Sequence, residues 1–187
     1  LCADAEANAT LAMLRNGVNT VRSTSAGRLY DAVSAMLGIR KCSTFEGEAA
    51  MNLQFAAERG IYDGDSVLPD PVQDGDPFII ETDRLFASLL RRRLAGENVE
   101  RLAYDFHRGL AEGIVAACKA VRERMGVNAV ALTGGTFQNL LLLRLCVEPL
   151  RENGFRVLLH SLIPPNDGGV GLGQAVAAMQ YLNDQMN

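Results

Sequence analysis

The sequence predicts an α/β fold with a helical first half, and three observations support this. Residues 1–60 contain segments of helical composition, each closed by a glycine. Two short apolar runs, at residues 127–133 and 155–160, are typical of strands buried on both faces, and each leads through a turn into helical sequence. The chain has 187 residues, 48% of them apolar, which is enough to bury a sizeable core.

The first half is predicted to contain three helices. The first runs from the start of the sequence to Gly17, a residue type that favours the end of a helix. The second follows Ser and Thr capping residues at 23–25, has apolar residues at helical spacing, and closes at Gly38. The third begins at "EGE" and ends at Gly60.

The middle of the chain changes character. Residues 61–81 are rich in proline and glycine and predict a loop with short strands, of which residues 77–80 are the best candidate. Thr82 is predicted to cap the helix that follows. A long helix is then expected up to Gly126, with one apolar stripe formed by Leu102, Phe106, Leu110, Ile114 and Ala117.

The final third has the order strand, helix, strand, helix. This order predicts that the two strands are parallel and joined by a right-handed crossover. Pro149 lies inside the first of these helical segments, where we expect it to kink or end the helix.

Composition excludes several classes of function. The formal net charge is −4, and basic residues are scattered apart from Arg91, Arg92 and Arg93, so no nucleic-acid-binding surface is expected. No apolar run approaches the ~18 residues of a membrane span, and no signal peptide is apparent, so a soluble, cytoplasmic protein is expected. The four widely spaced cysteines are expected to be reduced core thiols: Cys2, Cys42, Cys118 and Cys146. Because the sequence starts at Leu1, we expect a piece of a longer protein.

Two turns that follow the predicted strands are candidate ligand sites, because ligands of parallel sheets bind beyond the carboxyl ends of strands. Gly134 and Gly135 let a ligand approach the main chain, and the helix behind them offers free amides to a phosphate or an adenylate. An ordinary tight turn is the alternative. Asn139 has the donor and acceptor that a ribose or base requires, or it simply faces water.

The second turn, "PPNDGG" at residues 164–169, places Asp167 at the start of the last helix. Asp167 is either a helix N-cap or part of a metal or phosphate site.

Elsewhere, Asp31 leans over Gly27, which leaves room for a ligand hydroxyl, although a solvated carboxylate is the simpler interpretation. Gly47 lies at the start of the third predicted helix. His107, among apolar neighbours, is expected to be a core or interface residue rather than a ligand. An enzyme, a nucleotide-binding module and an interaction domain all remain open at this point.

Four stretches between residues 24 and 175 together resemble one family: "TSAGRLYDAVSAMLG", "FEGEAA", "LTGGTFQN" and "IPPNDGGVGLGQA". In this order they are similar to the C-terminal part of the HypF carbamoyltransferases, which mature nickel-iron hydrogenases and resemble the tRNA threonylcarbamoyl transferases. Arg28 stands where the tRNA-modifying relatives carry an acidic residue, which favours the hydrogenase branch. The resemblance implies one lobe of an actin-like (ASKHA, RNase H-like) ATPase fold, with residues 1–60 as a helical segment and residues 61–187 as the α/β lobe.

The resemblance also implies a function. In this family, carbamoyl phosphate and ATP yield carbamoyl-adenylate, and the carbamoyl group passes to the C-terminal cysteine of a partner protein, HypE. The implied nucleotide-binding residues are Asp31, Gly47, Gly134, Gly135 and Asn139. Asp167 is the implied ligand of a divalent metal (iron, zinc or magnesium), which residues outside this chain complete. No catalytic nucleophile is expected in this chain. The alternatives are a nucleotide-binding or partner-docking module without catalysis and a small-molecule kinase of the same superfamily.

Overall fold

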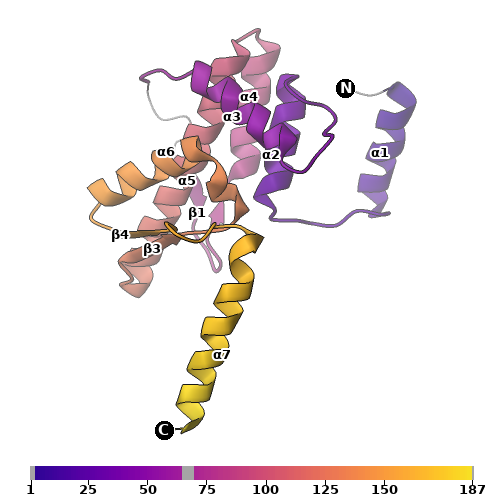
Figure 1. Cartoon of the computed structure of the whole chain (residues 1–187). Coiled ribbons are helices and arrows are strands. Elements are labelled where there is room, and N and C mark those ends of the chain that lie inside the picture. Colours follow the sequence, from indigo (N-terminus) through magenta and orange to yellow (C-terminus); the bar gives the residue numbers. More distant parts are fainter. Residues whose placement is uncertain (1–2, 65–69, 187) are drawn as a thin grey trace.

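The longest helix, α5 (Val99–Met125), lies at the centre of a mostly helical α/β structure and contacts α2, α3, α4 and α6 (Figure 1). The computed structural model describes residues 3–64 and 70–186. Asn98 caps the start of α5, since its side chain accepts a hydrogen bond from the Arg101 amide, and Gly126 ends it in the left-handed conformation. The predicted apolar stripe is buried at Leu102, Phe106 and Leu110. The prediction of this helix is therefore confirmed.

The three helices of the first half are also confirmed. They are α1 (Asp4–Asn16), α2 (Ala26–Leu37) and α3 (Glu48–Arg59). Gly17 and Gly38 adopt left-handed conformations after α1 and α2, and the Ser25 side chain caps α2. Helices α2 and α3 pack against each other and against α5, whereas α1 lies apart and contributes no buried residue (Figure 1).

The middle segment forms a small antiparallel pair, β1 (Val72–Gln73) and β2 (Ile79–Ile80), shorter than the predicted strand. Helix α4 (Thr82–Leu94) follows directly. The prediction that Thr82 caps this helix is wrong, because Glu81 is the cap residue and Thr82 is the first residue of the helix. The Glu81 amide donates to the Pro71 carbonyl, which fixes the cap residue between β2 and α4, and the Glu81 side chain makes no capping hydrogen bond.

The strands β3 (Ala129–Leu132) and β4 (Arg156–Leu159) pair in parallel, as predicted, with Ala129 opposite Arg156. Helix α6 (Leu140–Glu152) connects them and packs on α5. The helix continues through Pro149, so of the two expectations for this residue, a kink or an end, the end is wrong. Pro149 falls in the last turn, where it removes one hydrogen bond, while the buried Leu150 still anchors the segment to the core.

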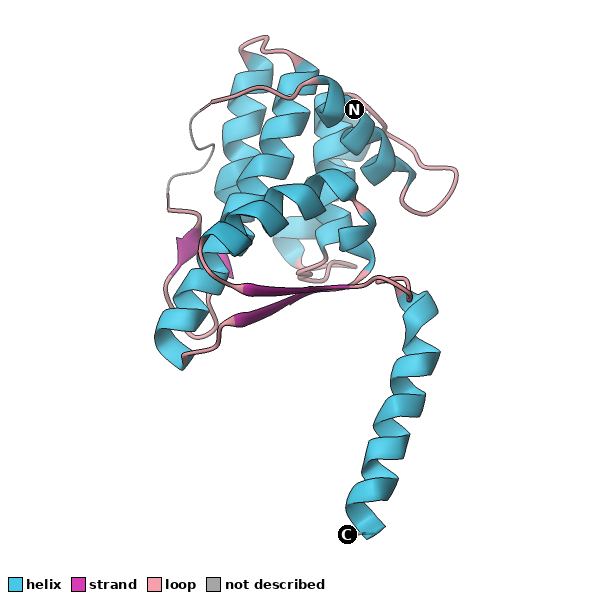
Figure 2. Cartoon of the chain, turned by 60° about the vertical axis from the view of Figure 1, so that its left-hand side comes forward, coloured by secondary structure: helices cyan, strands magenta, loops and turns pink. Residues whose placement is uncertain are grey.

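The prediction that both strands are buried on two faces is also wrong for this chain. Leu132 is buried, but Leu158 and Leu159 are 46% and 40% exposed. Helix α6 covers one face of the sheet, whereas the last helix, α7 (Val170–Met186), leads away from it (Figure 2). From residue 170 to residue 185 the side chains of α7 are exposed, including the large apolar ones: Val170, Leu172, Val176, Met179, Tyr181 and Leu182. Within the described residues, no helix has both the length and the apolar character needed to cross a membrane.

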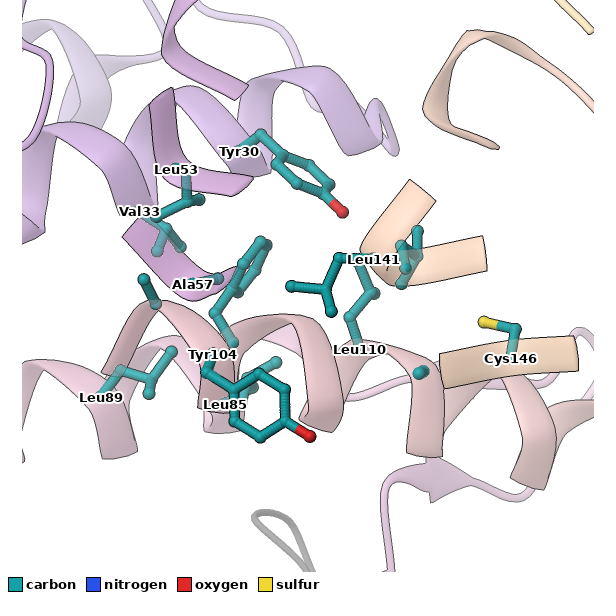
Figure 3. Packing of buried hydrophobic residues seen from close by; sticks show 14 of the residues in the cluster. Tyr30, Val33, Leu53, Ala57, Leu85, Leu89, Tyr104, Leu110, Leu141 and Cys146 are labelled. Atoms are coloured by element: carbon teal, nitrogen blue, oxygen red, sulfur yellow. The ribbon is translucent and has the colours of Figure 1, made fainter. Parts of the chain in front are cut away.

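The core lies between α2, α3, α4, α5 and α6 (Figure 3). Cys146 is buried there and Cys118 is half-buried, as expected for core thiols, and burial raises the pKa of Cys146 to about 12. Cys42 lies exposed in the loop between α2 and α3, so its prediction as a core thiol is wrong. Cys2 lies outside the described residues. No disulfide links Cys42, Cys118 and Cys146, the cysteines whose placement the structure describes.

His107 lies in the same core, as predicted, and is fully buried on α5. The edges of its ring pack against Tyr30 and Phe106, each with centroids 5.4 Å away. Its Nδ1 lies 2.8 Å from the Ala103 carbonyl oxygen. Burial lowers the pKa of His107 to about 4, so the imidazole is neutral near pH 7.

A buried carboxylate ties α4 and α5 to the segment after α3. Asp105, fully buried on α5, accepts hydrogen bonds from Arg92 of α4, from Arg108, and from the Tyr62 hydroxyl at 2.8 Å. Removing one partner of such a network leaves buried charges uncompensated. The ion pair between Arg59 and Glu100 joins α3 to α5 in a more exposed position and provides a comparison.

We expect Asp105→Ala to lower the free energy of unfolding by about 2–3 kcal/mol, because Tyr62, Arg92 and Arg108 lose a shared buried acceptor, although Arg92 keeps its ion pair with Glu97. The matched variant Glu100→Ala should cost less than about 1 kcal/mol, because its ion pair is solvated. Urea unfolding of the two variants measures both values. Equal losses would contradict the structural role of the Asp105 network.

The neutral state of His107 predicts a pH dependence of stability. The unfolded chain binds a proton near the ordinary histidine pKa of 6.5 and the folded chain only near 4. Acid therefore favours the unfolded state, and stability should fall by about 3 kcal/mol between these pH values. In urea unfolding across this range, His107→Gln should remove this decrease, and the exposed His160→Gln should retain it. A decrease in His107→Gln as large as in the unaltered protein would contradict the assignment, because the lowered pKa of Glu48 accounts only for the part near pH 4.

Candidate functional site

The loops that follow β3 and β4 meet at the carboxyl edge of the parallel sheet. The Gly134 amide, after β3, donates a 2.8 Å hydrogen bond to the carbonyl of Pro165, after β4. The Thr133 hydroxyl and His160 Nε2 lie 2.8 Å apart and join the ends of the two strands a second time. The expectation that these two turns share one edge of the sheet is confirmed.

A concavity of about 580 Å³ lies between the two loops and the first turns of α7. Gly134 lines it from the first loop, and Asp167 lines it from the second. His160 and Thr133 lie at its margin as well. Gly134 and Asp167 therefore line one shared volume.

The glycine turn has an open side. Gly134, with φ of 93° and ψ of 163°, adopts a conformation that suits only glycine, and it leads into the short helix η1 (Gly135–Gln138). A side chain at Gly134 or Gly135 would meet no heavy atom within 4 Å. The amides of Gly135 and Thr136 have no acceptor in the part of the chain that the structure describes. These amides, together with the start of α6, can donate to an anionic group.

Asn139 is held at the junction between this turn and α6. Its Oδ1 accepts a hydrogen bond of 2.9 Å from the Leu142 amide, so the residue is the N-cap of α6. Its Nδ2 lies 2.9 Å from Nε2 of the buried His107. The side-chain amide keeps one further hydrogen and one further lone pair with which it can contact a ligand.

Asp167 is not a helix cap. Asn166 supplies the cap of the short helix η2 (Asp167–Gly169), because its Oδ1 accepts a hydrogen bond from the Gly168 amide. The Asp167 side chain is exposed, and it has no hydrogen bond or ion pair among the described residues. Of the alternatives for Asp167, the N-cap is therefore contradicted.

The Asp167 carboxylate fits one position in the coordination sphere of a divalent cation, whereas it would repel a phosphate. Within residues 3–64 and 70–186, no three His, Cys, Asp or Glu side chains lie close enough to hold a metal together. A metal at Asp167 would thus require ligands from outside this part of the chain.

Of the predicted nucleotide-binding residues, Gly134 lines the concavity, whereas four do not: Asp31, Gly47, Gly135 and Asn139. Asp31, on α2, pairs through Oδ2 with Arg28 at 2.7 Å and is partly exposed. Gly47 is the left-handed residue that begins α3. Asp31 follows Tyr30, whose ring packs on His107, and His107 in turn contacts Asn139. The hydroxyl of Tyr30 points towards Leu141 in the first turn of α6 (Figure 3). A chain of contacts, from Tyr30 to His107 and from His107 to Asn139, therefore connects the helix of Asp31 with the glycine turn. No backbone hydrogen bond among the described residues joins Gly47 to that turn.

Sequence reasoning missed two groups near these residues. His160 is one of two histidines without paired-ligand spacing, although its place at the end of an apolar strand could have indicated the sheet edge. Glu48, next to Gly47, is buried and accepts hydrogen bonds from the amide and hydroxyl of Thr44. The amide hydrogen bond from Thr44 lowers the pKa of Glu48, and Arg40 adds to the effect. No capping-box pattern marked this contact, because Thr44 and Glu48 are four residues apart rather than three.

Known proteins resemble this chain over most of its length. Residues 2–174 match the family described as carbamoyltransferase, Kae1-like domain, second subdomain. The carbamoyltransferase HypF of Rhodobacter capsulatus is 41% identical over 171 residues, and the probable carbamoyltransferase HypF of Methanocaldococcus jannaschii is 31% identical over 164 residues. These alignments cover 89% and 88% of this chain and 21% of each relative.

Solved structures show the same relationship. The crystal structure of full-length HypF in the phosphate- and nucleotide-bound form has a TM-score of 0.87 and 32% identity, over 96% of this chain and 23% of that one. The T. kodakarensis HypF structure has a TM-score of 0.82 and 31% identity, over 97% of this chain and 23% of that one. The chain spans about a fifth of the length of these relatives, and it belongs to the HypF carbamoyltransferase family, as the second subdomain of the Kae1-like domain.

Proposed function

We propose that this chain is one lobe of an actin-like (ASKHA, RNase H-like) domain in a cytoplasmic carbamoyltransferase of nickel-iron hydrogenase maturation. In this proposal, the full-length protein transfers a carbamoyl group from carbamoyl-adenylate to the C-terminal cysteine of HypE. The hydrogen bond from Gly134 to Pro165 carries the proposal, because it brings Gly134 and the unpartnered Asp167 to one concavity. The free amides of Gly135 and Thr136 follow Gly134 directly in the chain. The likeness to a nucleotide-bound HypF structure supports a nucleotide at this site.

The glycine turn is suited to the phosphate of the adenylate. The free amides of Gly135 and Thr136 and the positive end of α6 favour a negative charge at this position. Asn139 would contact the adenosine with its remaining hydrogen and lone pair. Asp31 and Gly47 would complete the adenosine site from α2 and α3, and Asp31 Oδ1 has no partner among the described residues that would compete with a ribose hydroxyl.

The Asp167 carboxylate would hold the divalent metal (iron, zinc or magnesium), with further ligands from the remaining domains of the polypeptide. A metal bound there would neutralise charge on the AMP leaving group. The HypE thiolate attacks the carbamoyl carbon, a C–S bond forms, the C–O bond to the phosphate breaks, and AMP leaves. The turn amides hold the phosphate and orient the carbonyl towards the thiolate. The buried Cys146, with its raised pKa, does not serve as the nucleophile.

The exposed apolar residues of α7 and of the outer sheet face would pack against the remaining domains of the same polypeptide. Exposed apolar surface of this extent marks an interaction site rather than a solvated face. Residues 1–60 would then form the helical segment and residues 61–187 the α/β lobe of the proposed domain.

Asp167→Ala in the full-length protein should preserve the formation of carbamoyl-adenylate and reduce carbamoyl transfer to HypE by about 10²-fold or more, because a metal ligand is lost. Pyrophosphate release and mass spectrometry of the HypE C-terminus measure the two steps. Asp74→Ala, at an exposed carboxylate outside the concavity, should change neither.

Retained transfer in Asp167→Ala would contradict the proposed role of Asp167. If the unaltered full-length protein binds the nucleotide without any transfer, a nucleotide-binding or docking module is the better description. If it phosphorylates a small molecule instead, the kinase alternative holds.

The chain by itself should bind ATP only weakly, with a Kd above about 1 mM in the presence of a divalent metal, because part of the proposed cleft belongs to other domains. Isothermal titration calorimetry of residues 1–187 tests this expectation. Tight, metal-dependent binding would show that the lobe contains a complete site.

A further inference from the structure

A buried histidine orients the side-chain amide of Asn139 from the side of the core. His107 is fully buried, and its Nε2 lies 2.9 Å from Asn139 Nδ2. The residues are on different helices, since His107 belongs to α5 and Asn139 precedes α6. This contact connects the core directly to the glycine turn.

The hydrogen bonds determine where the protons lie. The Ala103 carbonyl can only accept, so His107 Nδ1, 2.8 Å away, carries the hydrogen. In the neutral ring, Nε2 then has no hydrogen and must accept one. Asn139 must therefore present its NH₂ group to His107, which leaves its Oδ1 to cap α6 at Leu142.

The reverse orientation of the amide is unfavourable on two counts. It would place Oδ1 against the lone pair of His107 Nε2, and it would place the NH₂ group against the Leu142 amide, which is itself a donor. The helix would also lose its cap. Because burial keeps His107 neutral, a proton on Nε2 does not relieve this mismatch near pH 7.

The same histidine also packs against Tyr30, the neighbour in sequence of Asp31. The Tyr30 ring, on α2, packs edge-on against His107 and against Phe106, with centroids 5.4 Å and 4.9 Å away. Asp31 is the next residue on α2. His107 thus fixes the amide of Asn139 relative to the helix that carries Asp31.

We propose that His107 is a positioning residue for nucleotide binding, which acts by fixing the orientation of the Asn139 side-chain amide beside the glycine turn. The inference rests on the proposed function, because it assigns adenosine monophosphate, the leaving group of the transfer, to this turn. His107 itself does not touch the nucleotide. The contact with His107 determines which hydrogen and which lone pair of the Asn139 amide remain for the nucleotide.

The test compares AMP affinity among variants of the full-length protein. His107→Leu removes the acceptor and should weaken AMP binding about tenfold, which corresponds to the loss of one oriented polar contact. His107→Gln places a carbonyl oxygen near the position of Nε2 and should stay within about threefold of the unaltered protein. Asn139→Ser keeps a cap for α6 but cannot reach His107, and it should weaken binding as much as His107→Leu.

A double-mutant cycle separates positioning from a general loss of structure. If His107 acts through Asn139, the double variant His107→Leu with Asn139→Ser should weaken AMP binding about tenfold, as each single variant does. An additive loss of about a hundredfold would overturn the proposal. Unchanged AMP affinity in His107→Leu, or no recovery in His107→Gln, would overturn it as well. Asn139→Ser retains the core histidine, so its result stands even if His107→Leu does not fold.

Carbamoyl transfer to HypE, measured on the same variants, distinguishes this inference from the proposed function. AMP affinities that follow the expected pattern without any transfer would support the role of His107 and contradict the proposed reaction. Normal transfer together with AMP affinities that do not depend on His107 would contradict the role of His107 alone. Failure of the unaltered protein to bind AMP would overturn the inference.

Discussion

One hydrogen bond, from the Gly134 amide to the Pro165 carbonyl, determines the geometry of the candidate site. The loops of a β-α-β-α unit emerge at the same edge of the sheet, but they need not touch. This bond and the contact between Thr133 and His160 draw them together, so that the glycine turn and Asp167 line one concavity. Because Asn166 takes the role of the helix cap, the Asp167 carboxylate stays available to a ligand.

Residues of the candidate site contact the buried core directly. Asn139 caps α6 and also contacts His107, which packs against Tyr30 of α2 within the apolar cluster. Residues from three helices therefore meet behind the glycine turn. The hydrogen bonds of Asn139 and His107 hold their side chains in one orientation, because a buried donor or acceptor without a partner is costly. The buried Tyr30 hydroxyl, by contrast, has no hydrogen-bond partner among the described residues. A nucleotide would meet a turn whose orientation is already set, which reduces the entropic cost of binding.

Signals from neighbouring residues predicted much of this fold. Contacts between residues far apart in the sequence could not be predicted in this way. Gly17, Gly38 and Gly126 end helices because their left-handed conformations depend on neighbouring residues only. Thr82 failed as a cap because the strand pairing of β2 fixes the preceding residue. The sheet is open on one face because α7 leads away from it, which composition does not reveal. The contacts of Asn139 with His107 and of Thr133 with His160, 32 and 27 residues apart, could not be inferred from local pattern.

The central claim is that the glycine turn and Asp167 serve one bound ligand. The most direct measurement is ³¹P relaxation of AMP bound to the full-length protein in the presence of paramagnetic Mn²⁺. Strong relaxation of the phosphorus in the unaltered protein, lost in Asp167→Asn while AMP still binds, is the expected result. Bound AMP whose phosphorus relaxation is the same in the two proteins would show that the carboxylate and the phosphate occupy separate sites.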